Sequence, residues 1–355
     1  MKRLLTLLLA AALSVTALAS CGGGDTAASS ASTSSSEIAA ASESSEESSA
    51  VSEASASETA EEGFTLYYPS YMQESEGETL KLEEKPERII ALSNSALQIL
   101  IRCDFEPIAV TEPTSFVEYP DWVSDLPVIS TGMSSLDIES VVSMEPDLVI
   151  MGNHLKEDYG AQLDAAGIPV YYTSEGPSIT YTEVKEEAEV LTRSFGTEAD
   201  VEEVQAEFAA VEERAAAFKE SMDPIPMMIL FAAPPSYQQT SKGYLGSILS
   251  MLPFENLSDD LIGADSRTAP LDLEKLVELN PEVLFAISPT SPSAEVLQAS
   301  YEEEFANNPD IWNNLQAVAN DNLIYLSSEY VTSKGIHIID SINSLIDMLE
   351  EKFAE

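Results

Sequence analysis

The sequence is short of cysteine, histidine and positive charge. Two cysteines among 355 residues cannot form a disulfide framework. Two histidines exclude a His-rich site for zinc or manganese, which needs several converging His and carboxylate ligands. Sixteen basic residues stand against 62 acidic ones, a net charge of -46. This charge disfavours non-specific binding to nucleic acid or to anionic membranes and suits a basic partner surface, although solubility explains it equally well.

Catalytic motifs are also missing. The chain contains no Gly-x-Ser-x-Gly, no phosphate-binding loop, no Cys-x-x-Cys and no His-Glu-x-x-His. His337 is expected within the last helix, and no recognisable motif places a serine or a cysteine beside it. The sequence therefore predicts a protein that is not an enzyme and has no cofactor of its own.

The longest apolar run stands at the N-terminus. Lys2 and Arg3 precede Leu4–Val15, which is too short to span a membrane, so residues 1–20 are predicted to be a signal peptide. Leu18-Ala19-Ser20-Cys21 resembles the bacterial lipoprotein box. That resemblance implies cleavage before Cys21 and a lipid on its thiol, with an ordinary secretory signal as the alternative.

A low-complexity segment, residues 21–62, follows. It is rich in Ser, Ala and Glu and has no Lys, Arg, Pro or aromatic residue, so it cannot bury enough apolar surface to fold. As a flexible coil it would span roughly 35 Å. Together with the lipid, this tether predicts an extracytoplasmic protein anchored to the cell membrane through Cys21.

One stretch of the sequence occurs twice. LDIESVVSMEPDLVI, residues 136–150, returns 135 residues later as LDLEKLVELNPEVLF, residues 271–285, with Leu, Asp, Glu, Val and Pro identical. The interval is too long for a solenoid, whose units run about 20–50 residues. Each copy predicts a short helix with an acidic tip, a proline stop and a buried strand, so the repeat indicates two related lobes.

Strands alternate with helices on both sides of a helical middle, as in parallel α/β sheets. Strands are expected at 64–71, 79–82, 88–92, 107–111, 147–151 and 169–173, and again at 227–231, 283–287 and 322–326. A capping box at Thr180–Glu183 begins one helix. The stripe Val201, Val204, Phe208, Val211, Ala215 and Phe218 then predicts a second helix, roughly 36 Å long.

These elements predict an α/β protein in which two doubly wound lobes are joined by one long interlobe helix. The expected domains are an N-terminal lobe at 63–180, a helical connector at 181–222 and a C-terminal lobe at 223–355.

The order of these elements resembles the class III extracellular solute-binding proteins, which feed ferric siderophores, haem or cobalamin to ABC importers. The resemblance covers about residue 79 to the C-terminus. It rests on Pro86-x-Arg88-Ile-Ile-Ala-Leu-Ser93, on Thr131–Glu139 with Pro146–Ile150, on the long middle helix, and on Asp265-Ser-Arg267 with Leu271–Glu274. It implies a monomer that holds its ligand between the lobes and delivers it to a permease dimer with a separate ATPase. A surface adhesin or signalling lipoprotein that keeps the fold but not transport is the alternative.

Ligand contacts are expected where loops follow strands, because open α/β sheets bind ligands there. They are Ser95, Met133, Asn153 and His154 in the first lobe, and Tyr237, Arg267, Thr290 and Tyr330 in the second. The tyrosines could equally be wall residues, and Arg267 is either a surface cation or an anion contact. His154 is either a polar turn residue or an axial ligand of haem or cobalamin.

The repeat also places one glutamate at the same position in each lobe, Glu139 and Glu274. Each could be a helix-tip carboxylate, but Asp137 and Asp272 already suit that role. The family resemblance implies instead that both glutamates dock into arginine pockets of the two permease subunits.

Overall fold

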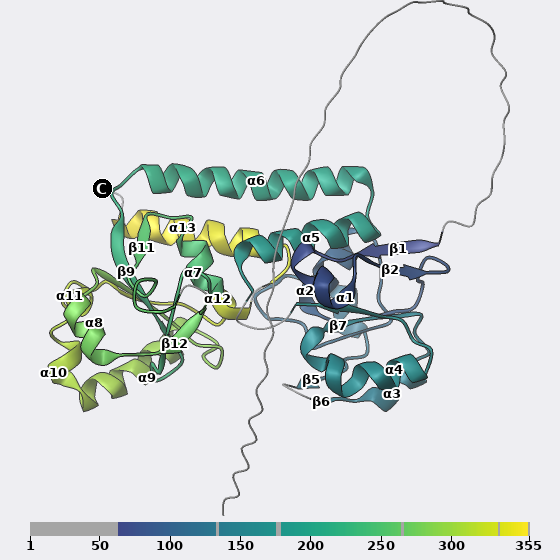
Figure 1. Ribbon diagram of the computed structural model, residues 1–355, viewed down its shortest axis with the longest axis horizontal. Coiled ribbons are helices and arrows are strands. Elements are labelled where there is room, and N and C mark those ends of the chain that lie inside the picture. The colour runs from purple at the N-terminus through teal and green to yellow at the C-terminus, as the bar shows by residue number, and fades with distance from the viewer. Residues whose placement is uncertain (1–62, 133–134, 175–178, 264–265, 333, 354–355) are drawn as a thin grey trace, which may run out of the picture. The chain divides into compact units, whose positions relative to one another are not determined.

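The structure is a computed structural model that describes residues 63–132, 135–174, 179–263, 266–332 and 334–353 (Figure 1). The predicted signal peptide, Cys21 and the tether lie outside the described residues. All described residues belong to one compact unit. Among them, no helix combines the length and the apolarity that crossing a membrane requires.

The N-terminal lobe is built on a fully parallel sheet with the strand order β4-β3-β7-β8. Its strands are β3 (Ile89–Leu92), β4 (Ala109–Val110), β7 (Leu148–Gly152) and β8 (Val170–Thr173). β3 and β7 are buried along their whole length, as expected for parallel strands covered on both faces. The helices of this lobe are α2 (Asn94–Arg102), α3 (Ile138–Ser143) and α4 (Ala161–Ala165).

Two antiparallel pairs complete this lobe. β1 (Phe64–Tyr67) pairs with β2 (Thr79–Leu82), and β5 (Thr131–Gly132) pairs with β6 (Ser135–Leu136). The predicted strand through residue 71 ends at Tyr67, because Pro69 caps a 3-10 turn that runs into α1 (Gln73–Glu76). Tyr68 turns inward and stacks on Tyr171 with ring centroids 4.4 Å apart.

The C-terminal lobe has a six-stranded mixed sheet with the order β12-β10-β9-β13-β14, in which β11 also pairs with β9. The strands are β9 (Ile225–Phe231), β10 (Tyr237–Gln239), β11 (Phe254–Asn256), β12 (Thr268–Pro270), β13 (Val283–Ile287) and β14 (Leu323–Tyr325). Its helices are α7 (Tyr244–Leu249), α8 (Leu273–Leu279), α9 (Ala294–Asn307), α10 (Pro309–Trp312), α11 (Gln316–Ala319), α12 (Glu329–Thr332) and α13 (Ile338–Phe353).

Alternate residues of β9 and β13 enter two separate hydrophobic clusters, one on each face of this sheet. Met227, Ile229 and Phe285 belong to one cluster, whereas Met228 and Leu284 belong to the other, which also holds Trp312. Both faces are therefore covered, which confirms a doubly wound arrangement in this lobe. The antiparallel edge strands β10 and β12 were not predicted.

Two helices connect the lobes, and the predicted interlobe helix is confirmed. α5 (Tyr181–Phe195) starts from the predicted capping box, and α6 (Glu198–Glu220) starts from a second one at Thr197. Five members of the predicted stripe are buried, namely Val204, Phe208, Val211, Ala215 and Phe218. α6 contacts α5 near one end and α13 near the other (Figure 1).

Ion pairs border this apolar face of α6. Arg102 of α2 lies 2.9 Å from Glu207, and Arg214 of α6 pairs with Asp347 and Glu350 of α13. α6 thus bonds with one helix of each lobe, as a rigid connection between them requires.

The segment after β7 is an irregular helix. A 3-10 turn at Asn153–Leu155 leads into one π-helical turn at Lys156–Gly160, and only Ala161–Ala165 is α-helical. The π-helical turn ends at Gly160, where a Cβ would lie 2.6 Å from the Tyr172 hydroxyl of β8.

Candidate functional site

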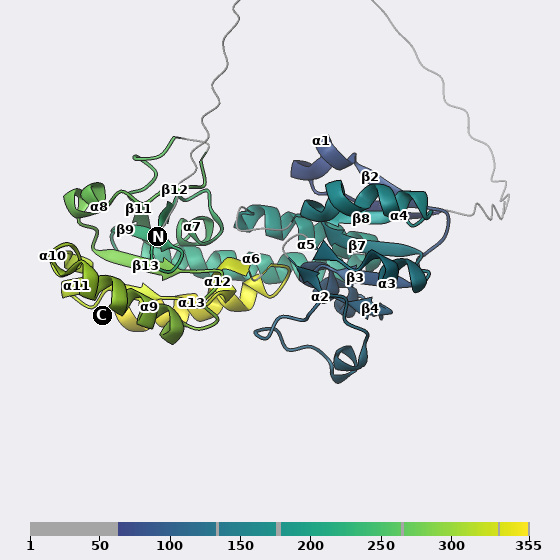
Figure 2. The same ribbon diagram turned by 90° about the horizontal axis from the view of Figure 1, so that it is seen from below.

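The two lobes touch directly where α2 meets the loop between α12 and α13 (Figure 2). The side-chain amide of Gln98 donates a 2.9 Å hydrogen bond to the Lys334 carbonyl, and its oxygen accepts one of 2.9 Å from the His337 backbone N–H. We call this contact the interlobe joint. Because one amide bonds with two groups of the facing loop, it fixes both the position and the direction of that loop.

A glycine allows the two lobes to approach closely at the interlobe joint. Gly335 has φ +82°, a conformation that residues with a Cβ rarely adopt, and a Cβ there would lie 2.9 Å from the Cα of Ser95. The loop therefore rests on the first turn of α2 with no side chain between.

His337 sits at this joint beside two carboxylates. Its Nε2 lies 3.4 Å from Glu329 Oε1, and its Nδ1 lies 3.4 Å from Asp340 Oδ2. Its ring stacks at 23° on Phe116 of the other lobe, with centroids 5.8 Å apart. The close contact with Glu329, helped by the charge of Asp340, raises the pKa of His337 despite partial burial. His337 precedes α13, whereas the sequence predicted it within the last helix.

A cavity of about 440 Å³ opens beside the joint, with walls from both lobes. Gln98, Ile101 and Arg102 of α2 and the loop 116–120 form one side, and Ile336, His337 and Asp340 form the other. Aromatic rings alternate with charged groups around it, a combination that suits a ligand with both apolar and polar parts.

A second contact between the lobes uses one of the predicted ligand residues. Arg267 lies 3.3 and 3.4 Å from the two oxygens of Glu183 in the first turn of α5. Next to it, the Tyr181 backbone N–H donates to the Ser247 hydroxyl at 2.8 Å. Arg267 is thus half of an interlobe ion pair, an alternative that the sequence did not suggest.

Two further predicted contacts lie in helices rather than loops, which corrects the sequence interpretation. Ser95 is in the first turn of α2, where its hydroxyl donates to the buried Glu187 carboxylate at 3.0 Å. Tyr330 is in α12, and its hydroxyl donates to the Ser341 carbonyl at 3.3 Å. Both side chains are buried, so they make internal contacts in this structure.

Four predicted contacts are exposed. Asn153 and His154 follow β7 in a 3-10 turn, and Thr290 follows β13 in a turn where it bonds with Ser288 at 3.0 Å. Tyr237, which was expected in a loop, is the first residue of β10 and is 45 % exposed. Met133 lies outside the described residues. The eight ligand contacts therefore stay predictions.

The sequence analysis overlooked Gln98, Phe116 and His337 as contacts between the lobes. No prediction was made for Gln98 or Phe116, and His337 was expected only to lie within the last helix. The sole sequence signal is Gly335, a glycine two residues before His337.

Glu139 and Glu274 occupy matching places, as the repeat predicted. Asp137 caps α3 by accepting from the Ser140 N–H, and Asp272 caps α8 by accepting from the Glu274 and Lys275 N–H groups. The carboxylates of both glutamates are exposed, and neither makes a hydrogen bond or an ion pair with another described residue. The helix-tip role thus belongs to the aspartates, and docking by the glutamates stays a prediction.

Neither cysteine chemistry nor a metal cluster marks the site. Cys103 ends α2, and burial raises the pKa of its thiol to about 11, so it is protonated at neutral pH. Within the described part of the chain, no three His, Cys, Asp or Glu residues gather to hold a metal ion.

Two α/β lobes, one connecting helix and a cavity between them define a two-lobed ligand-binding protein. A family model described as "Periplasmic binding protein" matches residues 89–330, more than half of the chain. The chain belongs to this family. The match confirms the predicted likeness to solute-binding proteins, and it identifies a binding protein rather than an enzyme.

Individual relatives are distant. The chain is 24% identical over 277 residues to a cobalamin-binding protein of Halobacterium salinarum, covering 77% of this chain and 72% of the relative. It is 21% identical over 294 residues to an uncharacterized ABC transporter substrate-binding lipoprotein, YvrC, of Bacillus subtilis, covering 80% and 87%. The crystal structure of an ABC transporter substrate-binding protein from Listeria monocytogenes superposes with a TM-score of 0.62 at 19% identity, covering 74% and 98%.

The close approach at Gly335 can be tested by substitution. Gly335→Ala should lower the free energy of unfolding by the cost of a left-handed alanine, about 1–2 kcal/mol, plus about 1–3 kcal/mol for overpacking against Ser95. Gly167→Ala is the control, because Gly167 has φ +73° with nothing within 4 Å. Urea denaturation measures both, and equal losses in the two variants would contradict the close approach.

The His337 cluster predicts a pH dependence. A group whose pKa is raised on folding adds stability that is fully present below its unfolded pKa, about 6.5 for histidine, and is lost as pH rises through the folded value. The wild type should therefore exceed His337→Gln in free energy of unfolding by more at pH 5.5 than at pH 8.5. Denaturation at both pH values checks this, and a gap that widens toward pH 8.5 contradicts it.

Proposed function

We propose that the chain is the substrate-binding component of an ABC importer. It captures cobalamin, haem or a ferric siderophore between its lobes and delivers it to a permease dimer driven by a separate ATPase. The observation that carries this proposal is the family match across both lobes and the helix between them. The printed names of the Halobacterium and Bacillus relatives support it, and the same relatives favour transport over an adhesin or a signalling lipoprotein.

The arrangement of the lobes suits capture without large movement. β7 and β13 both end at turns that supply predicted contacts, as ligand sites of open α/β sheets require. The α6 connection and the Gln98 joint already hold the lobes together, so little conformational entropy remains to be lost on binding. Modest closure is the expected motion.

The proposed ligand contacts divide by accessibility. Asn153, His154 and Thr290 are exposed at strand ends and could meet a ligand without rearrangement. Arg267 would bind a carboxylate or phosphate of the ligand by exchanging its bond with Glu183. Ser95 and Tyr330 would become accessible only if the loop at Gly335 moved. His154 is the proposed axial ligand where the cargo is haem or cobalamin.

The proposal includes attachment to the membrane outside the cytoplasm. Cys21 is the proposed lipidation site, and residues 22–62 are the tether that lets a monomer reach the importer. The printed name of the Bacillus relative, a lipoprotein, supports this attachment.

The first experiment identifies the ligand by fluorescence. Trp122 is half-buried, next to the cavity loop, whereas Trp312 is fully buried in a core cluster of the C-terminal lobe. One of cobalamin, haem or a ferric siderophore should therefore quench mainly Trp122, with a dissociation constant of about 1 μM or less, and the quenching should be lost in Trp122→Phe. Visible absorbance after gel filtration reports binding in the variant as well, and failure to bind any of the three would contradict the proposal.

A charge-reversal experiment tests docking. Glu139→Arg and Glu274→Arg should each abolish import, because a cation would face the proposed arginine pocket, while ligand affinity stays unchanged. Glu157→Arg and Glu303→Arg are controls with the same change in charge at other exposed sites, one in each lobe. Uptake of radiolabelled ligand by cells measures the effect, and normal import by both docking variants rejects the two docking roles.

A further inference from the structure

The two copies of the repeat share an exposed apolar residue. Val142 in α3 and Val277 in α8 stand 135 residues apart, at one of the five identical positions, and are 37 % and 43 % exposed. The neighbouring core position differs between the copies, Val141 against Leu276, although both side chains are fully buried. The buried position thus differs between the two copies of the repeat. The exposed position, which is the less buried of the two, is valine in both copies.

Each exposed valine stands one helical turn after a predicted docking glutamate. Glu139 precedes Val142 by three residues, and Glu274 precedes Val277 by three. Residues three apart on a helix are neighbours on its surface, so each lobe presents a carboxylate with an apolar side chain beside it. The aspartate caps leave both glutamates available for a partner.

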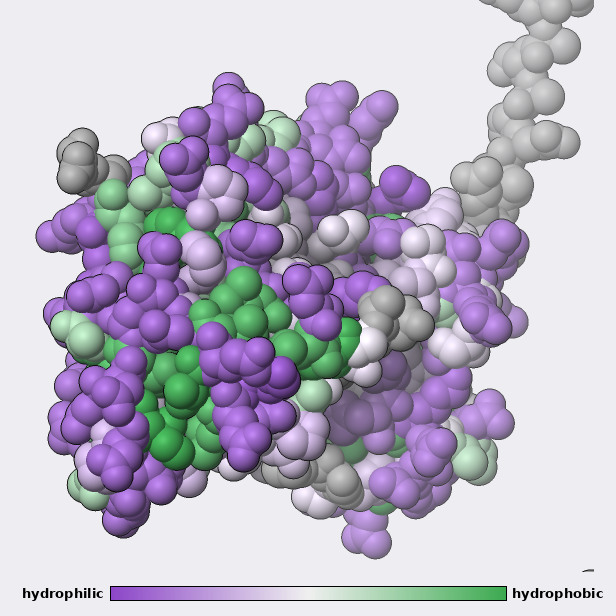
Figure 3. Space-filling view, turned by 60° about the vertical axis from the view of Figure 1, so that its left-hand side comes forward, coloured by the Kyte–Doolittle hydropathy of each residue, from purple (hydrophilic) through white to green (hydrophobic). Residues whose placement is uncertain are grey.

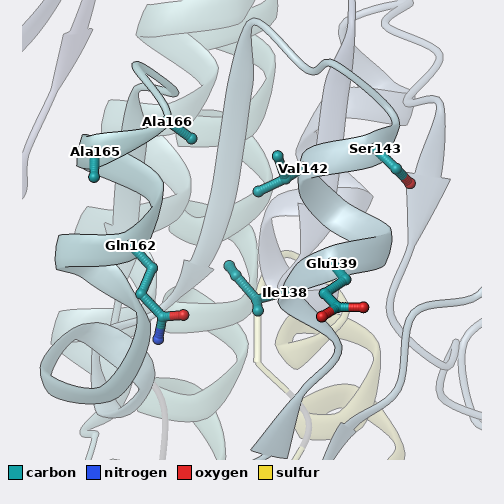
Figure 4. Close-up of a pocket in the computed structure, with 7 residues that line it drawn as sticks. All are labelled: Ile138, Glu139, Val142, Ser143, Gln162, Ala165 and Ala166. Carbon is teal, nitrogen blue, oxygen red and sulfur yellow. The ribbon is translucent and has the colours of Figure 1, made fainter.

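In the N-terminal lobe the valine lines a groove of about 530 Å³ between α3 and α4. Ile138 and Val142 point from α3 into the space between the helices, and the small Ala165 and Ala166 stand across from them (Figure 4). Glu139 is the one charged residue among the seven described residues that line this groove. The groove therefore has room for an apolar side chain next to a negative charge.

In the C-terminal lobe the same position is an exposed apolar residue of α8. Leu273, which lies one turn earlier on the same side of the helix, is half-buried. Figure 3 shows the side of the molecule that carries this lobe, and apolar residues gather there in a patch surrounded by hydrophilic ones.

We propose that Val142 with its groove, and Val277 beside Glu274, are the apolar halves of two docking faces for the permease. Each face would take a permease segment that offers an arginine or lysine to the glutamate and an apolar side chain to the valine. This inference rests on the proposed function, in which the permease is the partner. It adds Val142 and Val277 to the two glutamates.

Two observations favour a permease dimer as the occupant. The faces come from an internal repeat, so they suit a partner that itself presents two equivalent surfaces, one for each lobe. A carboxylate beside an apolar groove is also complementary to a basic, apolar segment rather than to another acidic chain of net charge -46. A second copy of this chain is thereby disfavoured.

The test uses serine substitutions with matched controls. Val142→Ser and Val277→Ser should each weaken binding to the permease–ATPase complex in lipid nanodiscs about tenfold, because each removes one buried valine from the interface. Val128→Ser and Val296→Ser are the controls, at valines that are 55 % and 47 % exposed, and each should change binding to the permease–ATPase complex less than twofold. Ligand affinity and the free energy of unfolding should stay unchanged in all four variants.

The outcomes distinguish the apolar docking faces from the proposed docking by the glutamates. If Glu139→Arg and Glu274→Arg abolish docking but the Val142 and Val277 variants bind like their controls, the apolar faces are rejected and the glutamate docking stands. If the glutamate variants also bind normally, the docking orientation itself is wrong. A photoreactive residue at position 142 or 277, used in intact cells, should cross-link to a permease subunit, and cross-linking to a second copy of this chain would overturn the assignment.

Discussion

The buried stripe on α6 is the interaction on which the rest of the structure depends. Val204, Phe208, Val211, Ala215 and Phe218 lie against both lobes, and ion pairs through Arg102 and Arg214 border the stripe toward α2 and α13. A helix of 23 residues does not bend easily, so the lobes cannot separate independently. The Gln98 amide and Gly335 add a second point of contact beyond the helix. Together with the Arg267–Glu183 ion pair, these contacts leave rotation of small amplitude as the motion open to the lobes.

That constraint links ligand capture with delivery. In the proposed docking, lobes that close only a little would present Glu139 and Glu274 at a nearly fixed spacing, and a dimeric permease would read that spacing. His337 lies at this joint, where its ring stacks on Phe116 of the other lobe and its two nitrogens face Glu329 and Asp340. The chemistry of the joint and the proposed docking faces thus depend on the same rigid frame.

Much of the fold could be predicted from the sequence, because strong local signals determine it. The six-residue stripe predicted α6, the Thr180 capping box predicted the start of α5, and the repeat predicted two lobes with matching helix tips. The antiparallel strands β10 and β12 were missed because they are short and one of them follows a proline-rich turn. The site was harder to predict. Ser95 is covered by a loop 240 residues away in sequence, and Arg267 meets Glu183 across the lobes, so neither environment has a local signature.

A crystal structure of the protein with the ligand that it retains would test the central claim most directly. The account predicts a ligand in contact with both lobes, with the hydrogen bonds from Gln98 to Lys334 and from His337 to Gln98 still formed. A ligand held by one lobe alone, or lobes rotated so far apart that both hydrogen bonds are lost, would contradict it.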